Sequence, residues 1–137
     1  MKAIIPNLAV KSIEETVKYY QDNFGFELQM AVDSLHDGFD EKIEEGKEYI
    51  WAMVVNGESS FMFQKDSSIK EDIGIFYENI GASLTFYIEI EDVEQLYNKI
   101  KSKVEIIKHI SITWYGQKEF YVKDCNGYIL GFASKDS

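Results

Sequence analysis

Two helix-start signals recur along this chain at a fixed distance. Ser12-Ile13-Glu14-Glu15 has the form of a capping box, in which the Ser12 hydroxyl accepts from the Glu15 N–H and the Glu15 side chain reaches back. Asp92-Val93-Glu94-Gln95 repeats this signal 80 residues later, with Gln in the Glu position. The same shift aligns Val10 with Ile90, Ile13 with Val93 and Tyr20 with Ile100. We therefore predict two copies of one structural unit.

Two turn signals repeat in the same way. Asn56-Gly57 and Asn126-Gly127 lie 70 residues apart, and each falls between runs of strand-forming residues. Asn-Gly favours a tight hairpin in which both central residues take positive φ. Each half then reads as strand, helix and three strands, and the first helix ends at Gly25 as a left-handed cap.

The sequence thus predicts an α+β fold of two βαβββ modules within one domain, residues 1–137. The first module spans residues 4–65, a connector spans 66–81, and the second module spans 82–135. The first copy carries ten extra residues, which we place in an acidic, solvated loop at 33–48. Four apolar residues suggest that the connector packs down: Ile73, Ile75, Phe76 and Ile80.

Composition excludes several classes of protein. The net charge of −10 and the pI of about 4.6 repel nucleic-acid phosphates, and no basic cluster offsets them. No apolar run approaches the roughly 18 residues of a membrane span, and no signal-peptide pattern opens the chain. The single cysteine, Cys125, lies in a predicted turn and fits a reducing compartment. We expect a cytoplasmic protein without nucleic-acid or membrane partners.

Four stretches in order along the chain resemble the glyoxalase/bleomycin-resistance/extradiol dioxygenase (vicinal oxygen chelate) superfamily, and most closely its metal-free bleomycin-resistance-like branch. They are Pro6-Asn7-Leu8-Ala9-Val10 with the helix start and Tyr19-Tyr20, Phe24-Gly25-Phe26, Phe61-Met62-Phe63-Gln64, and Tyr115-Gly116 with Glu119 to Tyr128. The resemblance implies curled mixed sheets around a cleft that takes a small molecule. It also implies a homodimer, in which halves are sometimes exchanged.

Metal-dependent members of that superfamily hold one divalent ion with about four His, Glu or Gln ligands. The resemblance carries these ligand positions onto Ile5, Thr85, Gly131 and a position near Met62. None of these side chains is a good ligand. A shift of register by one or two residues brings in Asn7 or Gln64 without restoring a full set. We therefore expect no metal and no cofactor.

Aromatic residues and one carboxylate are the remaining candidates for ligand binding. Trp51, Tyr87, Trp114 and Tyr115 fall on predicted strands or at their ends, where flat rings can stack on planar or cationic ligands or can simply fill the core. Glu119 begins an otherwise apolar strand, where it faces either a cleft or solvent. His36 reads as a solvated loop residue, and His109 as a structural or exposed strand residue.

Three functions stay open at this point. The first is metal-free binding of a small hydrophobic or cationic molecule, which the acidic charge and the aromatic content favour. The second is a metal-dependent lyase, isomerase or dioxygenase, which needs ligands that the sequence does not supply. The third is an interaction module without a small ligand. Whether any reaction is catalysed stays undecided, and the substituted ligand positions argue against it.

Overall fold

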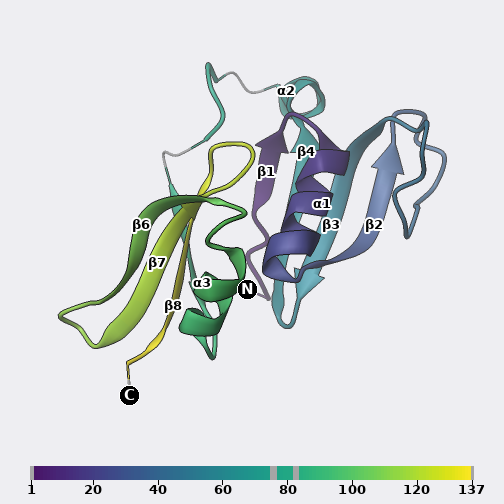
Figure 1. Cartoon of the computed structure of the whole chain (residues 1–137). Coiled ribbons are helices and arrows are strands. Elements are labelled where there is room, and N and C mark those ends of the chain that lie inside the picture. The colour runs from purple at the N-terminus through teal and green to yellow at the C-terminus, as the bar shows by residue number, and fades with distance from the viewer. Residues whose placement is uncertain (1, 75–76, 82–83, 137) are drawn as a thin grey trace. The chain divides into compact units, whose positions relative to one another are not determined.

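A computed structural model describes residues 2–74, 77–81 and 84–136. The chain divides into two compact units, Met1–Asn79 and Ile80–Ser137. Each unit contains one four-stranded mixed sheet with helices (Figure 1).

The first unit builds its sheet from four strands and packs one long helix against it. Its elements are β1 (Asn7–Val10), α1 (Ile13–Phe24), β2 (Glu27–Asp33), β3 (Tyr49–Asn56), β4 (Ser59–Lys65) and α2 (Asp66–Ile73). The strands lie in the order β1-β4-β3-β2, in which β1 is parallel to β4 and the other pairs are antiparallel. The helix α1 lies across one face of this sheet (Figure 1).

The second unit repeats this topology. Its elements are β5 (Thr85–Glu89), α3 (Val93–Ile100), β6 (Glu105–Ile112), β7 (Gln117–Lys123) and β8 (Ile129–Lys135). The order β5-β8-β7-β6 is that of the first sheet, again with a parallel edge pair. The α+β class and the two βαβββ modules predicted from the sequence are confirmed.

The helices α1 and α3 begin at the predicted caps. The Ser12 hydroxyl accepts from the Glu15 N–H at 3.2 Å, and the Asp92 carboxylate accepts from the Gln95 N–H at 3.0 Å. The Ser12 hydroxyl also donates to the Glu14 carboxylate at 3.1 Å, a hydrogen bond that the predicted capping box does not include. Glu14 also accepts from the Tyr49 N–H at 3.2 Å, so this carboxylate joins the helix start to β3.

The core of the first unit forms around Tyr20 on α1, which is fully buried. Its ring centroid lies 4.9 Å from that of Phe63 and 5.8 Å from that of Phe61, both on β4. Residues of one strand alternate between the two faces of a sheet, so Phe61 and Phe63 define the face that α1 covers. In the second unit Phe120 packs between Tyr97 of α3 and Phe132 of β8, at 5.1 and 5.4 Å.

Both Asn-Gly pairs lie in hairpin connections, but the predicted backbone conformation is wrong. Gly57 and Gly127 have positive φ, whereas neither asparagine does. Asn56 is instead the last residue of β3, and its side-chain Nδ2 donates to the Phe24 carbonyl at 3.0 Å. The asparagine thus satisfies a carbonyl at the end of α1 in place of forming the turn.

The acidic segment after β2 is exposed along most of its length, as predicted for a solvated loop, and hydrogen bonds hold it in place. Asp33 belongs to β2, is buried, and accepts from the N–H groups of Leu35 and Asp37 at 3.1 and 3.3 Å. Asp40 pairs with Ala31 through two backbone hydrogen bonds of 2.8 Å. These bonds were missed because short Asp-rich segments fold through side-chain to backbone contacts that no periodic pattern reveals.

The predicted connector contains a helix that the sequence analysis did not identify. Residues Asp66–Ile73 form α2, which buries Ile69 and ends at Gly74 with φ 74°. Ile73 does not pack down, since 58% of its surface is exposed, whereas Ile80 is half-buried. Ile75 and Phe76 lie outside the described residues.

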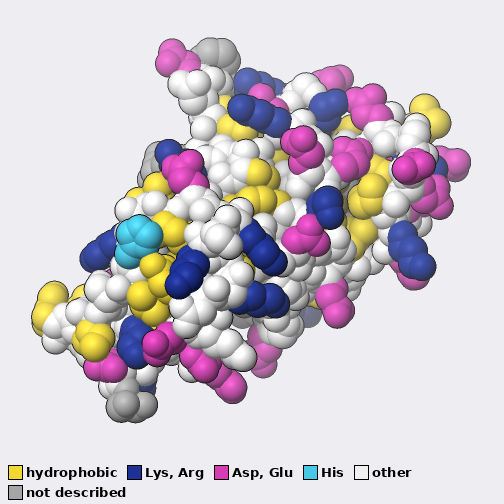
Figure 2. All heavy atoms as spheres, in the orientation of Figure 1, with side chains coloured by type: hydrophobic (Ala, Val, Ile, Leu, Met, Phe, Trp, Pro, Cys, Tyr) yellow, Lys and Arg dark blue, Asp and Glu magenta, His cyan; other side chains and the backbone are white. Residues whose placement is uncertain are grey.

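The surface carries the acidic character of the composition. Figure 2 shows Asp and Glu side chains spread over the face in view, interspersed with basic ones. None of the helices that the structure describes has the length and apolar character needed to span a bilayer.

Asn56 provides a test of the fold. Replacing Asn56 with Ala should lower the free energy of unfolding by about 1 kcal/mol, because the Phe24 carbonyl loses its donor. Asn56→Asp should cost more, since a carboxylate would then face a helix C-terminus. Chemical denaturation measures both variants, with exposed Glu58→Ala as a control that should change little. An Asp variant as stable as the wild type would contradict the assignment.

Candidate functional site

The face of the first sheet opposite α1 carries half-buried, mostly apolar side chains. Trp51 pairs with Gln64, and Met53 pairs with Met62 across β3 and β4. All four alternate with the residues that face α1. We name this surface the first open face.

A cavity of about 900 Å³ lies over part of this surface, between the first open face, the loop after β2 and α2. Its lining combines an indole ring, aliphatic and aromatic side chains, hydroxyls and two carboxylates. The lining residues are Val32, Ser34, His36, Phe39, Ile50, Trp51, Gln64, Ser67, Ser68, Glu71 and Asp72. The volume is within the range of pockets that hold small organic molecules.

Three polar side chains form a hydrogen-bonded chain at one wall of this cavity. Asn7 Nδ2 donates to Gln64 Oε1 at 3.0 Å, and Gln64 Nε2 donates to Ser68 Oγ at 3.1 Å. Since Ser68 accepts from the amide, its own hydroxyl proton is directed away from Gln64. Asn7 Oδ1 is buried and has no hydrogen-bond partner within the described part of the chain. Gln64 and Ser68 of the cavity lining are thus held in place by hydrogen bonds, and Asn7 supports them from outside the lining.

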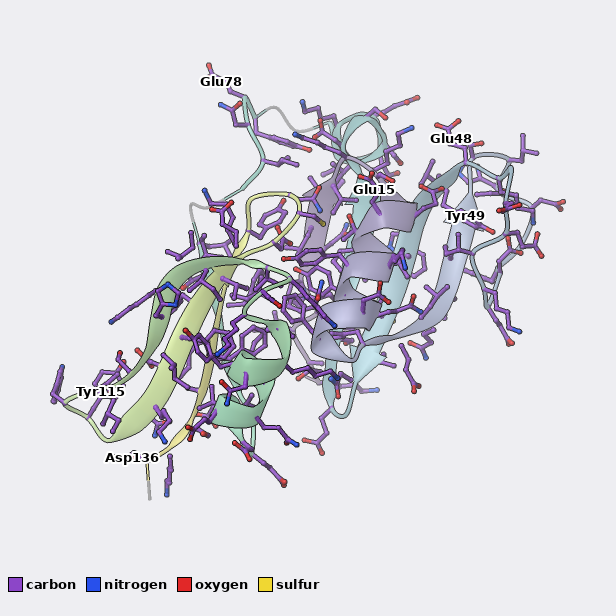
Figure 3. All side chains as sticks on the ribbon, viewed as in Figure 1. Glu15, Glu48, Tyr49, Glu78, Tyr115 and Asp136 are labelled. Atoms are coloured by element: carbon purple, nitrogen blue, oxygen red, sulfur yellow. The ribbon has the colours of Figure 1, made fainter. Side chains whose placement is uncertain are left out.

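The loop that contributes His36 and Phe39 to the cavity is held by a charged cluster. The Tyr49 hydroxyl donates to Asp40 at 2.7 Å, and Lys47 Nζ lies 2.9 Å from the same carboxylate. These two donors, Tyr49 first, hold the pKa of Asp40 below its usual value. Figure 3 shows Tyr49 at the start of β3, beside this loop. His36 has φ 55° and is exposed.

The corresponding face of the second sheet is built differently. Its strand β8 contributes the two smallest side chains, Gly131 and Ala133, and β5 and β7 lie on either side of it. Tyr87 and Tyr121 both pair with Gly131, and Glu119 pairs with Ala133. A Cβ atom at position 131 would lie 2.4 Å from Tyr121 Cε2, so the Tyr121 ring rests directly on the glycine backbone. We name this surface the second open face.

Glu119 accepts hydrogen bonds from two tyrosine hydroxyls. Tyr87 donates to Oε2 and Tyr115 donates to Oε1, each at 2.7 Å. Glu119 is only 2% exposed, whereas Tyr87 and Tyr115 are 46% and 49% exposed. The two rings therefore lie at the surface and direct their hydroxyls to a buried carboxylate. Tyr115 lies at the connection between β6 and β7 (Figure 3).

Burial and the Glu119 carboxylate raise the pKa values of the surrounding tyrosines. Burial and then the hydrogen bond to Glu119 raise the pKa of Tyr87. For Tyr115 the hydrogen bond to Glu119 is the larger cause of a raised pKa, and burial is the second. Burial and the nearby Glu119 charge also raise the pKa of Tyr121.

The structure brings together most of the residues predicted to bind a ligand. Trp51 lines the cavity of the first unit, and Tyr87, Tyr115 and Glu119 form one network in the second unit. Trp114 is 95% exposed, and its ring lies edge-on to Tyr115 at 5.2 Å. It lines neither feature.

Sequence reasoning missed most residues that line the cavity, among them Ser68, Glu71 and Asp72. Asn7 and Gln64 were considered only as alternative metal ligands, whereas they form the polar chain with Ser68. Tyr121 of the second open face was also missed, and the small residues Gly131 and Ala133 at alternate positions of one strand were the available signal for it. His109 is exposed, and its Nδ1 lies 2.7 Å from the Tyr97 hydroxyl on the helix side of the sheet.

The glyoxalase/bleomycin resistance protein/dioxygenase superfamily model matches residues 4–132. The chain belongs to this superfamily. A comparison with curated proteins found no match.

Solved structures support the same fold. A protein of unknown function from Agrobacterium tumefaciens is 20% identical, with a TM-score of 0.74 over 98% of this chain and 94% of that chain. A glyoxalase-related enzyme from Fulvimarina pelagi is 13% identical, with a TM-score of 0.73 over 98% and 89%. A glyoxalase/bleomycin resistance protein/dioxygenase from Nocardioides is 13% identical, with a TM-score of 0.70 over 98% and 85%. At these identities the likeness shows the fold alone.

The metal site of the superfamily does not fit the residues at its expected positions. Ile5 and Thr85 are exposed and Met62 is half-buried, and of these side chains only threonine offers oxygen, as a neutral hydroxyl. At Gly131 the space beside the strand is taken by the Tyr121 ring. Within residues 2–74, 77–81 and 84–136, no group of three or more His, Cys, Asp or Glu side chains could hold a metal ion.

The contact between Gly131 and Tyr121 can be tested by substitution. Gly131→Ala should destabilise the protein by about 1–3 kcal/mol, because the new methyl group overlaps the ring. In a Tyr121→Ser background the same change should cost much less. Equilibrium unfolding of the four proteins gives the coupling, and equal costs in the two backgrounds would refute the contact.

Alkaline titration of the tyrosine hydroxyls tests the network around Glu119. A pKa raised in the folded state contributes stability that is present below the ordinary tyrosine value of 10.0 and is lost as pH rises through the folded-state values. Ultraviolet absorbance of phenolate should therefore appear at lower pH in Glu119→Gln than in the wild type. Most of this difference should disappear when Tyr87 and Tyr115 are both replaced by Phe. Superimposable curves for Glu119→Gln and the wild type would rule out the network.

Proposed function

We propose that this protein binds a small hydrophobic or cationic molecule in the cavity of its first unit, without a metal. The cavity over Trp51 carries the proposal. At about 900 Å³ it is large enough for a planar organic ligand, and its lining is both apolar and acidic.

The lining residues offer different kinds of contact to a ligand. Trp51 provides a flat face for stacking, and Ile50 and Phe39 provide apolar contact area. The Ser68 hydroxyl, fixed by Gln64, offers a hydrogen-bond donor to an acceptor atom of the ligand. Glu71 and Asp72 place two carboxylates at the same cavity and thereby disfavour an anionic ligand.

The absence of a metal is part of the proposal, and it is supported by the residues at the expected ligand positions. Ile5, Met62 and Gly131 have no side-chain oxygen or nitrogen, and Thr85 has only a hydroxyl. The ring of Tyr121 also occupies the space that a side chain at position 131 would need. No observation favours metal-dependent catalysis over binding.

We also propose that the protein acts as a homodimer. The resemblance to the superfamily suggests this state, and several large apolar side chains are exposed in the second unit, among them Leu84, Ile107 and Ile112. Sedimentation at micromolar concentration should show twice the mass of one chain. A single-chain mass would remove this part of the proposal and leave the cavity unaffected.

Binding in the cavity can be read at Trp51 itself. The chain has two tryptophans, so Trp114→Phe leaves one indole N–H signal in nuclear magnetic resonance spectra. Proflavine, a planar cation, should shift this signal in a saturable way, whereas naphthalene sulfonate should not. Changing both Glu71 and Asp72 to their amides should weaken proflavine binding by about two- to tenfold.

The control for this experiment is an exposed acidic pair at the end of the sheet away from Trp51. Glu27 at the start of β2 and Glu58 in the turn between β3 and β4, changed to Gln together, remove the same charge from the same unit and should alter the affinity less than twofold. An indole signal that no probe shifts, or equal effects of the two double variants, would overturn the proposed site.

A further inference from the structure

We infer that the second open face holds a separate subsite for an organic cation that bears N–H groups, formed by Tyr87, Glu119 and Tyr115. None of these residues lines the cavity of the first unit. The inference therefore does not depend on the function proposed for that cavity.

The first step concerns the charge of Glu119. Its side chain is almost completely buried on a strand whose neighbours Phe120 and Val122 are core residues. No ion pair among the described residues includes Glu119, and the adjacent Lys118 pairs instead with Glu94 of α3 at 3.2 Å. A buried carboxylate without a basic partner is costly unless hydrogen bonds or a bound cation compensate it.

The second step concerns the direction of the hydrogen bonds. Both tyrosine hydroxyls donate inward to Glu119, one to each carboxylate oxygen. The lone pairs of the two tyrosine oxygens are then the acceptors closest to the carboxylate, and the Tyr115 hydroxyl also interacts with the Thr113 side chain. A hydroxyl that donates to an ionised acceptor becomes a better acceptor itself. The network thus extends the negative charge of a buried group to the oxygens of two half-exposed side chains.

The third step concerns the surrounding rings. Tyr87 and Tyr115 are each nearly half exposed, and the Tyr121 ring lies against the Gly131 backbone on the same face. The faces of tyrosine rings attract cations. Gly131 and Ala133 are required for this arrangement, because larger side chains on β8 would separate Tyr87 from Glu119.

These three features select one class of ligand. An anion would meet the Glu119 charge, and a quaternary ammonium would gain contact with the rings but could donate nothing to the two oxygens. A primary ammonium or a guanidinium satisfies both the rings and the tyrosine oxygens. We therefore assign the subsite to the amine or guanidine end of an organic cation.

Four probes of similar shape separate these contributions. Benzylammonium, benzyltrimethylammonium, benzyl alcohol and benzoate can each be titrated into the 137-residue chain, with binding followed by the backbone amide signals of Tyr87, Glu119 and Tyr121. Benzylammonium should bind most tightly and benzyltrimethylammonium more weakly. Benzyl alcohol and benzoate should leave these signals almost unchanged.

Substitution of the carboxylate provides the decisive comparison. Glu119→Gln should weaken benzylammonium binding about tenfold, because the charge is lost and one tyrosine hydroxyl is turned outward as a donor. Glu89→Gln is the matched control: Glu89 is an exposed carboxylate on β5, and its register partner Ala133 also pairs with Glu119. This control removes the same charge and should change the affinity less than twofold.

Three outcomes of these titrations would contradict the proposed subsite. Equal affinity for benzylammonium and benzyl alcohol, equal effects of the two Gln variants, or no binding of any probe would each overturn it. If Glu119→Gln does not fold, Tyr115→Phe replaces it and should weaken benzylammonium binding several-fold while Glu119 keeps its bond to Tyr87. Trp51→Phe should leave benzylammonium binding unchanged, which separates a failure here from a failure of the first-unit cavity.

Discussion

One packing constraint underlies the structure: in each unit a helix, α1 or α3, covers one face of a four-stranded sheet. Tyr20 on α1 packs against Phe61 and Phe63, and Tyr97 on α3 packs against Phe120. Because side chains alternate along a strand, burying these residues forces their neighbours onto the opposite face. The residues that alternate with the core residues therefore form the open faces, which carry the candidate sites.

The two units use this opposite face in different ways. The first leaves a cavity beside Trp51, walled by α2 and by a loop that Asp40, Lys47 and Tyr49 hold in place. The second fills its face with tyrosines around Glu119, which the absence of a side chain at Gly131 permits. The two units thus share one scaffold, and their open faces differ in the size of the side chains on single strands.

Sequence patterns predicted the fold well and the sites only in part. Caps at Ser12 and Asp92 depend on short-range bonds, so they could be identified by spacing. Tyr87, Tyr115 and Glu119 were each identified as candidates, but the bond from Tyr87 to Glu119 depends on the register of β5, β8 and β7 and joins residues 32 positions apart, so no local pattern could predict it. The helix α2 was missed because Lys65 at its start makes no side-chain capping bond. Trp114 was predicted to bind the ligand because an aromatic residue at a strand end gives the same sequence pattern whether its side chain faces a pocket or solvent.

We propose that the superfamily scaffold functions here without a metal, because Ile5, Met62 and Gly131 offer no ligand atom at the expected positions and Thr85 offers only a hydroxyl. Calorimetric titration of the metal-depleted protein with Ni²⁺, Zn²⁺, Mn²⁺ and Fe²⁺ tests this most directly. The account predicts no stoichiometric binding isotherm for any of the four ions. Binding of one ion per chain at micromolar affinity or tighter would contradict it.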